Sequence, residues 1–99
     1  MRTTSEDRRV IFDKYKELGS SFTDYLYDIS IKNYPGKKNI ELYLLDYHDD
    51  FMYFYKRDGV ADYYDIAFIF RRVANKVYRY LLKKGEAIYN KKFLNVVKP

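Results

Sequence analysis

The stretch DYHDDFMYFYKRDG, residues 46–59, holds the only histidine of the chain together with carboxylates and aromatic rings. If the stretch is extended, Asp46 and His48 lie on one face and could share a metal ion. Zinc sites mostly use imidazole and thiolate ligands, however, and the chain offers one histidine and no cysteine. We therefore expect a hairpin with one buried aromatic face, in which His48 binds no functional metal.

The residue patterns of common catalytic sites are missing from the sequence. The serines lie at predicted helix caps or within a strand, without a nucleophile-elbow sequence around them. The four glycines are spread singly, so none forms a phosphate-binding loop. Asp49 and Asp50 are adjacent and would face opposite sides of an extended chain, where they could not hold one proton or metal jointly. These observations favour a non-enzymatic protein without a cofactor.

Positive charge gathers in the last third of the chain. Residues 71–99 have a net charge of +8, whereas residues 1–70 have a net charge of −3. Within the basic part, four cations recur at intervals of four, three and four residues, which places them on one stripe of a helix. Such a ridge can follow the phosphates of a nucleic acid. The candidate nucleic-acid-binding residues are Arg71, Arg72, Lys76, Arg79, Lys83, Lys84, Lys91 and Lys92. Pairing with acids of the same fold, or simple solvation, is the alternative.

Aromatic side chains offer a second kind of candidate surface. In extended segments Phe51, Tyr53 and Tyr55 would share one face, as would Tyr43 and Tyr47 on the preceding strand. Sheet-surface aromatics beside basic residues hold single-stranded nucleic acids in several modules. The glycines that separate the aromatics in such signatures are absent from FMYFYKR, and one tyrosine face must also form the core. Structural aromatics on both faces therefore remain the alternative.

Three apolar residues point away from the main apolar stripe of the C-terminal helix. They are Phe68, Tyr78 and Leu82. Bulky apolar groups outside the core-facing stripe indicate either a second layer of the same chain or a partner. The first helix, the C-terminal tail or a second copy in a homodimer could cover them.

Hydrophobic periodicity and turn residues predict the elements that carry these side chains. Helical spacing, capping residues and Gly19 predict a helix over 5–18, and a long apolar stripe predicts a second helix from a cap at Asp62 to Gly85. Two-residue alternation predicts strands between them. The predicted strands are 21–34, 40–48 and 51–57, joined by turns at 35–39 and 49–50, and a fourth strand is one alternative for 93–97. The resulting fold class is α+β, with both helices packed on an antiparallel sheet in a single domain, 1–99.

Composition limits the environment in which the protein works. Neither cysteine nor glutamine occurs, whereas tyrosine, lysine and arginine are plentiful. Depletion of thermolabile residues predicts a thermostable protein, although an AT-rich genome would favour similar codons. No apolar run approaches the roughly 20 residues that a spanning helix needs, and the N-terminus lacks the apolar stretch of a signal peptide. We expect no membrane association and an intracellular protein.

The chain resembles two groups of proteins in different respects. The order of helix, three strands and helix over residues 5–84 is similar to that of the double-stranded-RNA-binding domain. That family's basic cluster opens its second helix, where this chain has DYYDIAF, so no site residue is carried over. In its small size and its tyrosine- and lysine-rich, cysteine-free composition, the chain resembles uncharacterised proteins of filamentous viruses that infect hyperthermophilic archaea. That resemblance implies a viral accessory protein, located in the host cell cytoplasm or associated with the virion.

These observations favour a non-enzymatic binding protein whose basic C-terminal helix meets DNA or RNA. The alternative is a protein-interaction module, which could be a homodimer, that contacts a host or viral protein through its exposed aromatic side chains. The two differ in their response to salt, because phosphate contacts weaken steeply with ionic strength and apolar contacts do not.

Overall fold

The computed structural model describes residues 3–32 and 40–85, and helices are the only secondary-structure elements within these ranges. The elements are α1 (Ser5–Leu18), the short 3-10 helix η1 (Gly19–Ser21), α2 (Phe22–Lys32), α3 (Ile40–Asp58) and α4 (Ala61–Lys83). The predicted α+β class is therefore wrong: the described residues contain no strand, and the three predicted strands correspond to α2 and α3. The resemblance in element order to the double-stranded-RNA-binding domain is therefore also wrong, because it depended on the three predicted strands.

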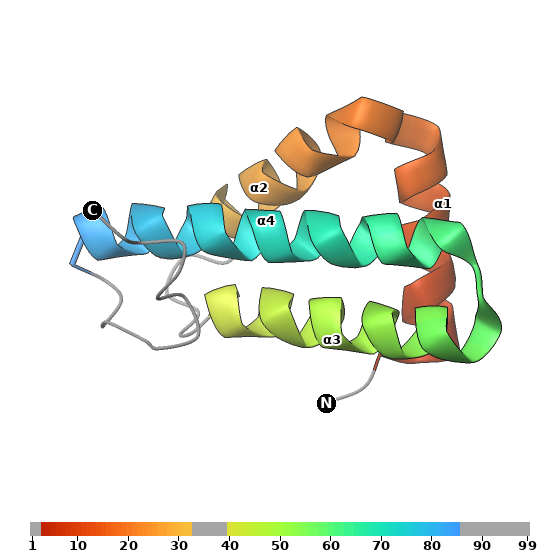
Figure 1. The fold of residues 1–99 in the computed structure, drawn as a ribbon. Coiled ribbons are helices and arrows are strands. Elements are labelled where there is room, and N and C mark those ends of the chain that lie inside the picture. Colours follow the sequence, from red (N-terminus) through yellow and green to blue (C-terminus); the bar gives the residue numbers. More distant parts are fainter. Residues whose placement is uncertain (1–2, 33–39, 86–99) are drawn as a thin grey trace.

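The helices pack around α4. Figure 1 shows α3 and α4 side by side and antiparallel, α2 packed against a second side of α4, and α1 crossing near the α3–α4 turn. That turn contains only Gly59 and Val60. Gly59 has a φ of 70°, and its N–H donates to the carbonyl oxygen of Tyr55 at 2.8 Å. A left-handed residue at this position favours glycine, so the predicted end of the element at Asp58–Gly59 is confirmed, although the element is a helix.

The predicted first helix is confirmed. Thr4 and Asp7 form a capping box, in which the Asp7 N–H donates to the Thr4 hydroxyl at 3.0 Å and the Thr4 N–H donates to the Asp7 carboxylate at 3.3 Å. At the other end Gly19 has a φ of 55°, which ends α1 and turns the chain through η1 into α2.

Helix α2 buries residues four apart, not every second residue. Phe22, Leu26 and Ser30 are buried, and the Ser30 hydroxyl donates to the carbonyl oxygen of Leu26 at 2.7 Å. The tyrosines that suggested a strand are half-exposed, because a tyrosine ring can cover apolar surface while its hydroxyl stays in water. Tertiary packing against α4 thus outweighs the local preference of tyrosine and β-branched residues for strands.

Helix α3 runs through the predicted turn at Asp49–Asp50. Its buried apolar residues are Ile40, Leu44, Phe51 and Phe54, and Tyr47 packs partly buried between them. The intervals between these five positions are four, three, four and three residues, which is the spacing of a helix face against a partner helix. No glycine or proline interrupts the segment from Ile40 to Asp58. The predicted hairpin in residues 46–59 is therefore wrong.

Helix α4 is the predicted C-terminal helix, and it buries a wider face than its predicted stripe. Its buried residues are Ile66, Ala67, Phe70, Val73, Ala74, Val77 and Tyr78, which form two neighbouring rows because α2 and α3 pack on adjacent sides. Gly85 follows the helix with a φ of 71°, as predicted. The predicted cap is wrong: Val60 occupies the N-cap position, and Asp62 in the first turn pairs with Lys16 of α1 at 2.8 Å.

Aromatic rings from every helix meet in the core. Phe70 of α4 lies 5.0 Å from the ring of Tyr47, 5.9 Å from Phe51 and 6.5 Å from Phe22 between centroids. Tyr15 extends this contact network onto α1 through Phe22 at 5.9 Å. The predicted turn at 35–39 and the fourth strand at 93–97 lie outside the described residues. Over the described helices, no segment is both long and apolar enough to traverse a lipid bilayer.

Candidate nucleic-acid interface

Four cations form a continuous line on the exposed side of α4. We call Arg72, Lys76, Arg79 and Lys83 the basic stripe, and all four side chains are exposed. They span about 16 Å of helix at about 1.5 Å per residue. The ion pairs in residues 3–32 and 40–85 involve other cations, so none of the stripe is neutralised by an acid of the described fold. The predicted helix geometry of the stripe is thus confirmed, whereas its ligand stays a prediction.

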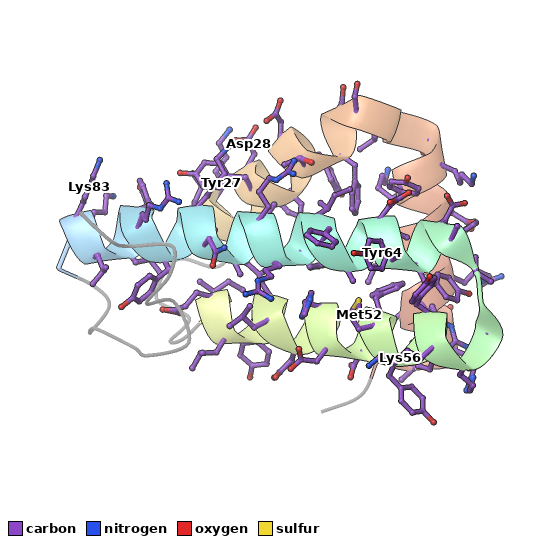
Figure 2. All side chains as sticks on the ribbon, viewed as in Figure 1. Tyr27, Asp28, Met52, Lys56, Tyr64 and Lys83 are labelled. Atoms are coloured by element: carbon purple, nitrogen blue, oxygen red, sulfur yellow. The ribbon has the colours of Figure 1, made fainter. Side chains whose placement is uncertain are left out.

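A pocket lies between the stripe and α2. It is an open hollow of about 230 Å³, lined by Tyr27, Lys76, Arg79, Tyr80 and Lys83. We call it the α2–α4 pocket. Figure 2 labels Tyr27 on α2 and Lys83 on α4, both near the C-terminal part of α4. Because three of the five lining side chains are exposed cations, the pocket presents positive charge beside two aromatic rings.

The tyrosines of the pocket already have cations near their rings. The Lys76 ammonium lies 5.2 Å from the centroid of the Tyr27 ring, and the Lys84 ammonium lies 4.8 Å from that of Tyr80. Both distances are within the range of cation–π contacts. Lys84, one of the candidate nucleic-acid-binding residues, thus lies beside the pocket at the C-terminal end of α4. Tyr27 and Tyr80 were not predicted as site residues.

Arg71, the remaining predicted basic residue that the structure describes, does not extend the stripe. At about 100° per residue, Arg71 points about a quarter-turn away from Arg72 and farther still from Lys76. Arg71 is exposed, but it belongs to a different face. Lys91 and Lys92 lie outside the described residues. The structure therefore brings together five of the eight predicted residues, namely the stripe and Lys84.

The predicted partner surface is partly wrong. Phe68 is exposed at 48%, but Tyr78 is only 1% exposed and belongs to the core. Leu82 is half-buried and packs against the core. Both corrections have one cause: α4 is covered on two adjacent sides, so its buried arc is wider than the stripe that a sheet would cover.

A different set of rings surrounds Phe68. The Tyr64 ring lies 5.0 Å from that of Phe68 and 5.2 Å from that of Tyr55 on α3, and Tyr64 is 39% exposed. We call Tyr55, Tyr64 and Phe68 the aromatic row. Its members on α4 are four residues apart, which is a helical signal available in the sequence. The contact between Tyr55 and Tyr64 could not be predicted from the sequence, because it depends on α3 being a helix.

The helical form of residues 46–58 changes what this segment can do. Two residues apart on a helix, Asp46 and His48 point to nearly opposite sides and do not share a face. The His48 imidazole instead lies 2.9 Å from the carboxylate of Asp49. No group of three histidine or acidic side chains that could hold a metal occurs among the described residues. The stacking platform on predicted strands is also wrong, because Phe51 is in the core while Tyr53 is exposed.

Two buried carboxylates lie on α3 and outside the pocket lining. Asp50 accepts a hydrogen bond from the backbone N–H of Thr3 at 2.6 Å, which ties the start of the described chain to α3. Glu41 is 5% exposed, and its Oε1 has no hydrogen-bond partner. Neither lines the α2–α4 pocket.

Comparison with known proteins identifies no relative of this chain. No family model matches the chain, and no curated protein or solved structure is significantly similar to it.

Proposed function

We propose that this protein is a non-enzymatic binding protein that holds nucleic acid through the basic stripe of α4. The observation that carries the proposal is that Arg72, Lys76, Arg79 and Lys83 are exposed, aligned and free of ion pairs within the described fold. Cations left without an acid attract an external polyanion, and about 16 Å of helix corresponds to about five phosphates of one strand. The compositional resemblance to proteins of archaeal viruses favours a viral accessory role.

The proposal predicts a steep dependence of affinity on salt. If the four cations each neutralise one phosphate of duplex DNA, log affinity should fall against log salt with a slope of about −3 to −4. Substituting both Arg72→Ala and Arg79→Ala should make the slope shallower by roughly two, since two contacts are lost. Neither side chain is buried, so the helix content should not change. Fluorescence anisotropy with labelled DNA across a salt series measures both slopes.

A matched control removes the same amount of charge elsewhere. Arg9 and Lys14 lie on α1, where each pairs with an acid three residues away. The double variant Arg9→Ala, Lys14→Ala should keep the slope of the wild type. Equal and weak binding by the wild type and the Arg72, Arg79 variant would reject nucleic-acid binding by the stripe.

The aromatic row favours a second candidate function, contact with another protein. Tyr64 and Phe68 expose ring surface on a face that the described helices leave uncovered. Binding at such a face to a host or viral protein, or to a second copy of the chain, should change little with salt. Analytical ultracentrifugation of the wild type and of Phe68→Ser tests the homodimer. A single monomeric species over the concentration range would exclude self-association there.

A further inference from the structure

We propose that the α2–α4 pocket takes one unpaired base of a single-stranded nucleic acid against Tyr27, while cations at the pocket rim hold neighbouring phosphates. The inference rests on the proposed function and narrows its ligand from nucleic acid in general to single strands. It names Tyr27, on α2, as a binding residue outside the basic stripe.

The composition of the pocket favours a base together with phosphate. A phosphate-binding ridge needs only cations, but here Tyr27 and Tyr80 stand beside Lys76, Arg79 and Lys83. Proteins that bind single strands combine these two features: a positive groove that follows the backbone and aromatic rings on which bases stack. In a duplex the bases are paired and stacked on each other, so they could not enter a pocket between two helices.

The size of the pocket agrees with a single flat group. Its volume of about 230 Å³ is below the roughly 300–1,000 Å³ of sites that enclose a drug-sized ligand. A whole nucleotide chain must therefore lie outside the pocket, along the exposed stripe, and insert one base. The stripe runs directly beside the pocket, because three of its four cations also line it.

Tyr27 packs partly against the core, and it also lines the pocket, where a base could meet its ring. One of its contacts is the Lys76 ammonium at 5.2 Å from the centroid, and Lys76 is exposed on a flexible side chain. A cation–π contact at an exposed site is weaker than the stacking of a base on an aromatic ring. A base can thus displace Lys76 from the ring, and the displaced ammonium remains close enough to pair with a phosphate of the same strand.

The aromatic row is the weaker candidate for base stacking. Tyr64 contacts both Tyr55 and Phe68, and Arg72, one turn after Phe68, is the stripe cation nearest to this row along α4. Only the start of the stripe therefore lies beside the aromatic row, whereas three of the four stripe cations line the α2–α4 pocket. The α2–α4 pocket has both an aromatic surface for a base and several cations for the neighbouring phosphates.

The test compares two labelled single strands of about ten nucleotides, one ordinary and one with abasic sugars along its length, at fixed salt. Phosphate contacts are the same in both, so any difference reports the bases. Wild-type protein should bind the ordinary strand about 5- to 100-fold more tightly than the abasic strand. Tyr27→Leu should remove this preference, whereas Tyr27→Phe, which retains the ring, should keep it. Tyr53→Leu, on α3 and outside the pocket, is the matched control and should also keep it.

The outcomes separate this inference from the proposed function. Equal affinity of wild-type protein for both strands, with a normal salt slope, would overturn base stacking and leave phosphate binding in place. Retention of the preference in a folded Tyr27→Leu variant would overturn the assignment to Tyr27. If Tyr27→Leu does not fold, the wild-type comparison still decides whether bases contribute, and Tyr27→Trp, which enlarges the ring surface, should strengthen the preference if Tyr27 carries it. No binding of either single strand would overturn this inference, and the salt series on duplex DNA would then decide the proposed function by itself.

Discussion

Phe70 is the residue on which most of the packing converges. Its ring contacts Phe22 of α2 and both Tyr47 and Phe51 of α3, and it is 2% exposed. Phe70→Ala should lower the free energy of unfolding by about 3–5 kcal/mol, because it removes buried ring surface and leaves a cavity. That loss is a large fraction of the roughly 5–15 kcal/mol of a small domain. Urea unfolding followed by circular dichroism measures it.

Phe68 provides the matched comparison for this prediction. It lies two residues earlier on the same helix and is 48% exposed. Phe68→Ala should change stability by about 0.5 kcal/mol or less, as for most surface substitutions. Equal effects of the two substitutions would contradict the central role of Phe70 in the core.

At the scale of elements, the sequence predicted the helices that have clear ends. Thr4, Gly19 and Gly85 mark the limits of α1 and α4, and local chemistry at those residues sets the ends independently of tertiary packing. The strand predictions for α2 and α3 were wrong because tyrosine was counted as a core residue. Exposed tyrosines such as Tyr43 and Tyr53 produced a two-residue alternation that the folded chain does not use.

Two features of the sequence indicate that α3 is a helix. The first is the run of nineteen residues from Ile40 to Asp58, which has neither glycine nor proline. The second is a helical spacing within that run, at intervals of four, three, four and three, in Ile40, Leu44, Tyr47, Phe51 and Phe54. For α2 the sequence is ambiguous, because its eleven residues contain both patterns and only packing on α4 decides between them.

Helix α1 is anchored to α4 by groups that should make its docking sensitive to alkaline pH. The hydrogen bond with Asp62, and the charge of that carboxylate, raise the pKa of Lys16. Burial, and then the charges of Asp65 and Asp62, raise the pKa of Tyr15. Both groups hold their proton more tightly in the folded state. Their stabilisation is therefore complete below the unfolded pKa values of about 10 and is lost as pH rises through the folded values.

We expect the thermal midpoint to fall as pH rises above about 10. Tyr15→Phe should make this fall shallower, because phenylalanine has no phenol to ionise, and Asp62→Asn should weaken the contribution of Lys16. Circular-dichroism melts from pH about 8 to about 11 compare the three proteins. A fall as steep in both variants as in the wild type would exclude the α1–α4 contact as its source.

For the whole molecule, the concentration of positive charge in the C-terminal part could be predicted from the sequence. The pocket that lies beside this charge could not. The intervals between Arg72, Lys76, Arg79 and Lys83 predicted one exposed stripe before any fold was known. The α2–α4 pocket depends on Tyr27, which comes from a segment predicted as a strand about fifty residues earlier in the chain. No local pattern indicates such a contact, because it arises only when α2 packs along α4.

The aromatic contacts also predict how the whole molecule unfolds. Rings of α1, α2, α3 and α4 form one connected set through Phe22, Phe51 and Phe70, so no helix separates without breaking core contacts. We expect a single cooperative transition in which far- and near-ultraviolet circular dichroism coincide. The absence of cysteine and glutamine, together with this core, predicts a calorimetric midpoint above the ~45–65 °C of mesophile domains. A midpoint within that range would contradict the thermophile interpretation, and transitions that differ between the two probes would show that part of the bundle unfolds separately.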